Sequence, residues 1–121
     1  MFTGIVQNLG RVINYTNGEL DISTSLDLRD CKIGSSICCN GVCLTVTDIK
    51  SKDGEYTFKV NLGEETQQRT NFSNNKFYKL SNVNNINIEK SLKIGDEISG
   101  HFVYGHVDRT THITKIIKLN N

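Results

Sequence analysis

The chain has 121 residues, a net charge of +1 and 36% hydrophobic residues, which suits one domain that buries its own core. The pI near 7.7 and the lack of a basic block argue against nucleic acid or an acidic membrane surface as a partner. The sequence shows no apolar run near the roughly 18 residues of a transmembrane helix and no secretory signal at its start. We therefore expect a cytoplasmic protein.

Most of the chain predicts short β-strands separated by turns. In chain order the predicted strands cover residues 2–13, 20–24, 36–49, 56–62, 86–89 and 110–119. Residues 56–62 alternate apolar and polar side chains, as a half-buried strand does. A short helix is predicted over residues 64–71, because two acidic residues begin it, and a polar loop over 71–85. About six strands and one short helix predict an all-β barrel or sandwich.

Three dipeptides mark the turns between these strands. Asn17-Gly18 predicts a hairpin turn, since both residues tolerate positive φ. Asp53-Gly54 predicts the next one. Asn40-Gly41 leaves two alternatives open, a hairpin turn or a sharp kink within one long strand.

Four cysteines, at positions 31, 38, 39 and 43, raise the question of a metal site or disulfides. The Cys-Cys-x-x-x-Cys spacing matches no usual zinc site, and Cys38 and Cys39 would face opposite sides of a strand. Disulfides are not expected without a secretory context. We expect reduced thiols that pack mostly as small apolar residues.

Residues 100–108 hold two of the three histidines, His101 and His106. Positions five apart on a straight strand face opposite ways, but Gly105 inside the stretch indicates a bulge or bend. We expect a bent strand that carries both imidazoles toward one mouth of a β structure, with metal binding and catalysis both open. His112 has no motif around it and is predicted to be a surface residue.

Five motifs along the chain, in this order, resemble those of the riboflavin synthase family of lumazine-binding barrels. They are Met1-Phe2-Thr3-Gly4-Ile5-Val6, Asn40-Gly41-Val42-Cys43-Leu44-Thr45-Val46-Thr47, Glu65-Thr66-x-x-Arg69-Thr70-Asn71, Asn87-Ile88-Glu89 and Gly100-His101-x-x-x-Gly105-His106-Val107-Asp108. The resemblance implies a six-stranded Greek-key β-barrel. It also implies the dismutation of two 6,7-dimethyl-8-ribityllumazine molecules by four-carbon transfer, which gives riboflavin and a ribitylamino-pyrimidinedione, with no metal or organic cofactor.

The resemblance has one large departure. Family enzymes carry two such barrels in tandem, and their active site lies between barrels of neighbouring protomers. This chain resembles the N-terminal barrel alone, so we expect one lumazine-binding domain over residues 1–121, without the second barrel. We expect self-association as a C2 dimer, or a trimer for a full two-barrel chain. A lumazine- or flavin-binding module without turnover is the alternative.

The resemblance also implies the residues that bind the substrate. They are Gly4, Ile5, Val6, Cys43, Leu44, Thr45, Asn61, Leu62, Gly63, Glu64, Glu65, Thr66, Gly105, His106 and Val107. Residues 4–6 would contribute from the partner side. For Thr45 the alternative is a strand residue on a solvated face, and for Glu64 it is the start of the helix.

The implied reaction needs a base for the C7 methyl proton of one lumazine and a nucleophile or water that adds to C7 of the other. His101 and His106 are candidates for proton transfer, because imidazole titrates near neutral pH; bracing of the barrel is the alternative. Ser36 and Cys43 are candidate nucleophiles or orienting groups. A thiol near its normal pKa is mostly protonated at pH 7, so packing is the alternative for Cys43. Phe2 is a candidate stacking and positioning residue.

Overall fold

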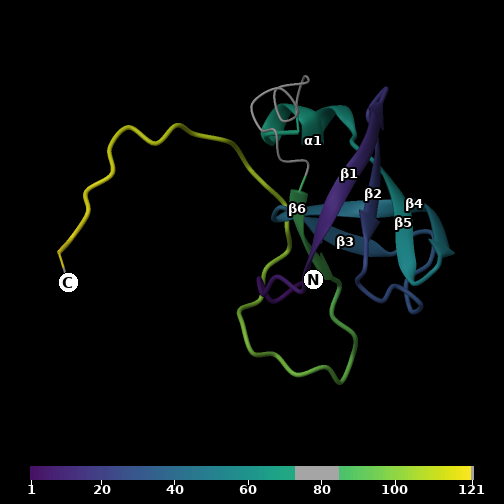
Figure 1. Ribbon diagram of the computed structural model, residues 1–121. Helices are drawn as coiled ribbons and strands as arrows, with labels where there is room; N and C mark the ends of the chain where they lie inside the picture. Colours follow the sequence, from purple (N-terminus) through teal and green to yellow (C-terminus); the bar gives the residue numbers. More distant parts are fainter. Residues whose placement is uncertain (73–84, 121) are drawn as a thin grey trace.

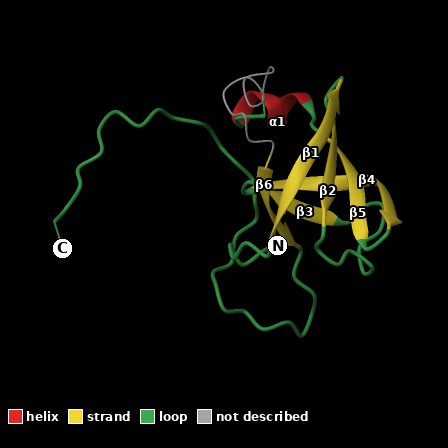
Figure 2. Ribbon diagram, viewed as in Figure 1, coloured by secondary structure: helices red, strands yellow, loops and turns green. Residues whose placement is uncertain are grey.

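The computed structural model describes residues 1–72 and 85–120 of the chain (Figure 1). Its elements are β1 (Asn8–Thr16), β2 (Glu19–Thr24), β3 (Ser36–Cys39), β4 (Val42–Lys52), β5 (Glu55–Asn61), α1 (Glu64–Arg69) and β6 (Asn85–Lys90). The strands pair in the order β1-β2-β5-β4-β3-β6, and β6 pairs with β1 to close the barrel. Figure 2 shows the strands wrapped around one another with α1 at one end. The predicted six-stranded all-β barrel is confirmed.

The strand order is of the Greek-key type. β3, β4 and β5 follow one another as hydrogen-bonded neighbours, and β2 lies beside β5 rather than beside β3. All the strand pairs are antiparallel. Each of the six strands in the described part of the chain has a neighbour on both sides, so closure removes the free sheet edge.

The three predicted turns each hold two residues at positive φ. The φ angles are 52° and 80° at Asn17-Gly18, 49° and 85° at Asn40-Gly41, and 51° and 81° at Asp53-Gly54. Two successive residues of this kind match the right-handed twist of the flanking strands. The alternatives at Asn40-Gly41 are thereby decided, because a tight hairpin joins β3 to β4 there.

Alternate residues of the strands fill the barrel interior. The fully buried apolar side chains on strands are Leu20, Ile22, Ile37, Cys39, Val46, Phe58, Val60, Ile86 and Ile88. Cys39 belongs to this core, whereas its neighbour Cys38 does not, so the two thiols face opposite sides of β3 as predicted. The four cysteines are free thiols.

Strand β1 begins at Asn8, not at residue 2 as predicted. Residues 1–7, which we call the N-terminal segment, bend at Gly4, where φ is +84°. The backbone N–H groups of Thr3 and Gly4 donate to the side chain of Glu89 instead of to a strand. Phe2 is fully buried and forms an isolated bridge with Val103.

The strands predicted over residues 100–108 and 110–119 are wrong, because residues 91–120 contain one isolated bridge and no strand. In Figure 1 this part of the chain loops below the barrel and its last stretch runs away from it. The closed barrel has no free edge for another strand, and Gly105, at φ +72°, interrupts the extended backbone. We call residues 100–107 the crossing segment.

The last stretch keeps the apolar pattern that suggested a strand. Its exposed apolar side chains are Ile113, Ile116, Ile117 and Leu119, at 67% to 81%. His112 is exposed, as predicted. The polar loop predicted over residues 71–85 lies largely outside the described residues. Within the described ranges, no helix is long and apolar enough to cross a membrane.

Candidate ligand-binding site

A hollow of about 330 Å³ opens between the start of β4, α1 and the crossing segment. This volume lies within the range of small-molecule sites, about 300–1,000 Å³. The residues that line it are Val42, Cys43, Glu65, Thr66, Arg69, Thr70, Gly105, His106 and Val107. We call it the first hollow.

The helix α1 gives the first hollow its polar wall. Acidic residues in its first turn and Arg69 in its last turn suit the helix dipole. Residues four apart share one helix face, which places Glu65 beside Arg69 and Thr66 beside Thr70. Arg69 Nη2 lies 2.9 Å from Glu65 Oε1, and Thr70 Oγ1 donates to the Thr66 carbonyl at 2.7 Å. The ion pair is exposed to solvent and contributes only about 0.3–0.5 kcal/mol, so a ligand can reorganise it at little cost.

The crossing segment reaches the first hollow through one close backbone contact. The backbone N–H of Cys43 donates to the carbonyl of Gly105 at 2.8 Å. A Cβ atom at Gly105 would lie 2.8 Å from the Cys43 nitrogen, and the residue has a positive φ. Both facts require glycine there. The contact brings His106 and Val107 to the wall of the first hollow.

The structure brings together some of the predicted binding residues and separates others. Those that line the first hollow are Cys43, Glu65, Thr66, Gly105, His106 and Val107. Those that do not are Gly4, Ile5, Val6, Leu44, Thr45, Asn61, Leu62, Gly63 and Glu64. The side chains of Leu44 and Leu62 face the barrel core instead, at 3% and 2% exposure. Thr45 is exposed, opposite the half-buried Ser36 of β3.

The N-terminal segment lies on other hollows. Gly4 and Val6 line a second hollow of about 350 Å³, together with Cys38, Glu89 and Gly105. Gly105 therefore lies between the first and second hollows. Phe2 is completely buried, so its ring is not accessible for stacking on a ligand in this conformation.

The two histidines of the crossing segment are not equivalent. His106 lines the first hollow, whereas His101 does not. The backbone N–H of His101 donates to the Thr3 carbonyl at 2.9 Å. The expected meeting of two imidazoles at one mouth is thus not seen, and His106 is the imidazole that a ligand in the first hollow would meet.

The thiols also differ in their surroundings. Burial raises the pKa of Cys38 to about 11 and raises the pKa of Cys39 as well, so both stay protonated near neutral pH. Cys43 is half-buried at the first hollow. Among the described residues, no group of three or more His, Cys, Asp or Glu side chains is placed to hold a metal ion.

The family model of the lumazine binding domain matches residues 3–91. This match covers the whole barrel and α1, and well over half of the chain. The chain belongs to the lumazine-binding domain family. Residues 105–107 lie outside the matched range, so the first hollow of this lumazine-binding domain is completed by a segment beyond it.

Among the relatives of this lumazine-binding domain are several bacterial riboflavin synthases. The protein of Brucella abortus (strain 2308) is 39% identical over 120 residues, covering 95% of this chain and 57% of the relative. Those of Bacillus subtilis (strain 168) and Bacillus amyloliquefaciens are 34% and 38% identical over 125 residues, covering 100% of this chain and 54% of each relative. The chain spans about half the length of the curated relatives it matches.

Sequence reasoning did not assign three of the residues around the first hollow, namely Val42, Arg69 and Thr70. For Arg69 and Thr70 a signal was present, because each follows a predicted binding residue by four positions on the predicted helix. Val42 directly precedes Cys43 on a strand. Because successive strand residues face opposite sides, alternation alone predicts that Val42 points away from a site that Cys43 lines.

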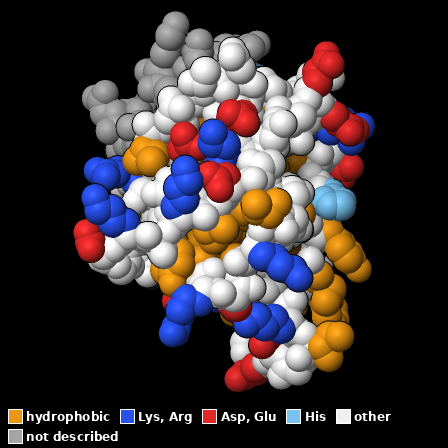
Figure 3. Space-filling model, turned by 90° about the vertical axis from the view of Figure 1, so that its right-hand side faces the viewer, with side chains coloured by type: hydrophobic (Ala, Val, Ile, Leu, Met, Phe, Trp, Pro, Cys, Tyr) orange, Lys and Arg blue, Asp and Glu red, His pale blue; other side chains and the backbone are white. Residues whose placement is uncertain are grey.

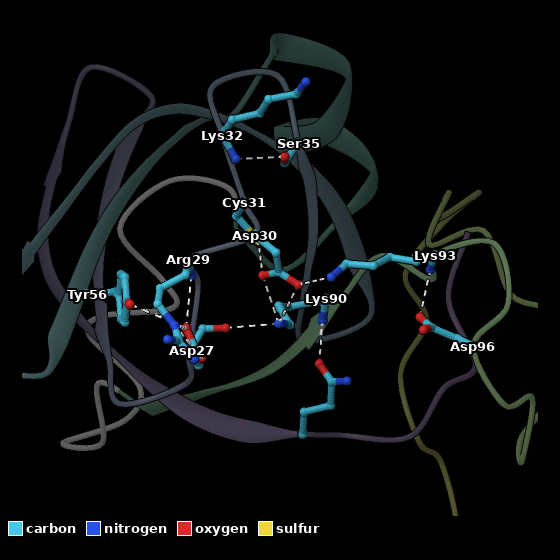
Figure 4. Close-up of polar contacts among 11 residues, drawn as sticks. Asp27, Arg29, Asp30, Cys31, Lys32, Ser35, Tyr56, Lys90, Lys93 and Asp96 are labelled. Carbon is cyan, nitrogen blue, oxygen red and sulfur yellow. Dashed lines mark hydrogen bonds and ion pairs between the residues drawn. The ribbon is translucent and has the colours of Figure 1, made fainter.

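A charged cluster lies on another side of the lumazine-binding domain (Figure 4). Lys90 and Lys93 both point to Asp30, and Lys90 Nζ lies 3.0 Å from Asp30 Oδ1. These ammonium groups lower the pKa of Asp30 to about 2. Beside them, hydrogen bonds from Arg29 hold the pKa of Asp27 well below its usual range. The cluster fastens the chain just after β6 to the loop that follows β2.

Proposed function

We propose that this lumazine-binding domain is part of a riboflavin synthase, a transferase, and binds 6,7-dimethyl-8-ribityllumazine in the first hollow. The names of the relatives support this assignment. The single observation that carries it is the first hollow itself, which a member of this family forms from Cys43, Thr66 and His106. We also propose a cytoplasmic location, in keeping with the four free thiols.

The chemistry of the first hollow fits the ligand. Lumazine is a flat, polar heterocycle with a ribityl chain, and such ligands need a few polar groups that fix their orientation. Thr66 offers its hydroxyl group at the wall of the first hollow, and the exposed Glu65–Arg69 pair can accept and donate hydrogen bonds. We propose that these groups hold the ribityl hydroxyls and that backbone groups hold the ring edge.

In the proposed reaction, the conjugated ring acidifies the C7 methyl of one lumazine. A base removes its proton, a nucleophile or water adds to C7 of the second lumazine, and a four-carbon unit passes between them. Holding two reactants in register can lower such a barrier by about 7–11 kcal/mol, which would be the main contribution of the protein. We propose His106 as the group that moves or orients the proton, with Cys43 beside it as an orienting group. No metal or organic cofactor is needed for these steps.

The second ring requires a second barrel. In the N-terminal segment, Gly4-Ile5-Val6 has the same pattern as Gly105-His106-Val107, but Ile5 and Val6 are 48% and 51% exposed. We propose that residues 4–6 line the ligand site of a facing barrel, in a C2 dimer or in a trimer of two-barrel chains. Exposed apolar side chains also gather in the lower part of the face shown in Figure 3, as an association surface would require. The binding unit would span residues 1–121, a range that includes the barrel and the crossing segment, both of which line the first hollow.

A binding module without turnover is the second candidate. The described residues form one hollow with the lining of the first hollow, whereas the reaction needs sites for two lumazine rings. If identical barrels pair, both sites are alike, and the difference between donor and acceptor is lost. The expected result is then binding with weak turnover.

Titration with 6,7-dimethyl-8-ribityllumazine, followed by its fluorescence, tests the proposal, and an assay for riboflavin separates the two candidates. Binding with steady riboflavin formation supports the enzyme, and binding without product supports the module. Glu65→Gln should weaken binding, whereas Glu64→Gln, one residue away and outside the first hollow, should not. Lack of binding by the unaltered chain would overturn both candidates.

A further inference from the structure

The carboxylate of Glu89 is buried and its bonds lead to the N-terminal segment. Glu89 lies on β6 and is 6% exposed. Its Oε1 accepts hydrogen bonds from the Thr3 backbone N–H at 2.6 Å and the Thr3 hydroxyl at 2.9 Å, and its Oε2 accepts one from the Gly4 N–H at 3.1 Å. Among the described residues, none of the ion pairs includes Glu89. Backbone and hydroxyl donors therefore satisfy this carboxylate.

Two successive backbone N–H groups converge on the Glu89 carboxylate, as in an anion-binding nest. Successive backbone N–H groups converge on one anion where a residue of positive φ follows an ordinary one, and Gly4 has φ +84°. The Thr3 hydroxyl also accepts a hydrogen bond from the Ile5 N–H at 3.2 Å. Hydrogen bonds to an ionised acceptor are about twice as strong as neutral ones. The carboxylate thus fixes the backbone conformation of residues 3–5.

The same residues hold the crossing segment. The Thr3 carbonyl accepts the His101 N–H at 2.9 Å, and Phe2 and Val103 exchange two backbone hydrogen bonds of 2.8 and 3.1 Å. A Cβ atom at Gly100 would collide with the Thr3 carbonyl oxygen, so the two backbones touch. Two residues after Val103, the chain reaches the contact with Cys43 at the first hollow.

Glu89 itself does not line the first hollow; it borders two others. It can act on a ligand in the first hollow only through the segments that it holds. We propose that Glu89 is a positioning residue for ligand binding, because its carboxylate orders the N-terminal segment and thereby places the crossing segment across the first hollow. This inference rests on the proposed function for the identity of the ligand.

The substitution Glu89→Gln tests the proposal, because it removes the negative charge while the size of the side chain stays the same. The amide oxygen can keep the Thr3 donors, but the amide nitrogen then faces the Gly4 N–H, and the negative charge is lost. We expect the Kd for 6,7-dimethyl-8-ribityllumazine to rise about tenfold, which corresponds to one charge-assisted hydrogen bond. Glu89→Asp keeps the charge and should recover part of the affinity. Glu55→Gln is the matched control, since Glu55 is an exposed strand carboxylate that accepts a hydroxyl hydrogen bond from Ser23.

Amide hydrogen exchange separates positioning from simple stabilisation. In Glu89→Gln we expect faster exchange at His101, Val103 and Cys43, and unchanged exchange at Ile22 and Phe58 in the β2–β5 pair. Thr3→Val, which removes only the hydroxyl, should show the same pattern more weakly, and it keeps the test open if Glu89→Gln fails to fold.

Two results would overturn the proposal. One is wild-type affinity and exchange in Glu89→Gln, and the other is uniformly faster exchange over the whole barrel. If the unaltered chain binds no lumazine, the proposed function fails. The exchange at His101 and Cys43 still decides whether Glu89 places the crossing segment.

Discussion

The N-terminal segment and the crossing segment are built alike and held differently. Each has a residue of the Phe2–Val103 bridge, then a glycine at positive φ two positions later, then a bulky residue and a valine. The N-terminal segment is fixed to β6 by the Glu89 carboxylate and by the Gln7 N–H, which donates to the Ile88 carbonyl at 2.9 Å. The crossing segment contacts the barrel through the Gly105 carbonyl and the Val107 side chain, and its other backbone hydrogen bonds go to the N-terminal segment.

This difference shows how a site can depend on contacts that the barrel does not need. The six strands and the buried residues of their core lie within residues 8–90, and of the later residues Val107 packs against this core. The first hollow, in contrast, takes one wall from the crossing segment. Substitutions there should therefore change ligand binding much more than the free energy of unfolding.

The largest expected effect compares the two glycines at positive φ. In Gly105→Ala the new Cβ meets Cys43 at 2.8 Å, whereas in Gly4→Ala the nearest atom is Val103 Cγ2 at 3.8 Å. Positive φ alone costs an alanine about 1–2 kcal/mol. We expect about a 100-fold rise in the Kd for lumazine in Gly105→Ala, because strain and collision add, and at most about tenfold in Gly4→Ala. Equal effects in the fluorescence titration would mean that the two segments are equivalent.

The histidines give a smaller and sharper comparison. His106→Ala should raise the Kd about tenfold, the effect of losing one or two polar contacts, because this side chain lines the first hollow. His101→Ala should change the Kd less than about threefold, because its link to Thr3 is a backbone bond that alanine retains. Unfolding in urea should be close to wild type for both variants. A larger effect for His101→Ala would place its imidazole at the ligand.

The smallest expected effect concerns Asp30, whose ion pairs with Lys90 and Lys93 hold the residues that lead from β6 to the crossing segment. The folded pKa of Asp30, about 2, lies below the value near 3.9 of an unfolded chain. Its contribution to stability is thus present above about pH 4 and is lost as the pH falls to about 2. The difference in urea midpoint between wild type and Asp30→Asn should be small at pH 6 and vanish near pH 2. A difference that stays constant over this range would show that the carboxylate charge is not responsible.

Local chemistry made the barrel predictable. Asn17-Gly18 and Asn40-Gly41 determine their turns through positive φ, and the alternation around Phe58 and Val60 identifies a strand whatever its partner. The last predicted strand, over residues 110–119, did not form because a further strand needs a free sheet edge to pair with. The apolar pattern from Ile113 to Leu119 does not reveal that the barrel has already closed.

The site was less predictable than the barrel, for a related reason. Glu65 and Thr66 were assigned through their motif, whereas Arg69 and Thr70, although part of the same motif, were not assigned; the helical period places them beside Glu65 and Thr66. The link between Glu89 and Thr3 spans 86 positions. A buried acid at the end of a strand carries no local sign of its partner, so its role emerges only from the folded chain.

The stretch after the crossing segment affects how the protein can be handled. The side chains of Ile113, Ile116, Ile117 and Leu119 are exposed, and exposed apolar segments of this kind promote intermolecular β-pairing. With a net charge of +1 and a pI near 7.7, electrostatic repulsion between molecules is weakest in ordinary neutral buffers. We therefore expect less aggregation through this stretch when the protein is stored well away from pH 7.7 and at low concentration.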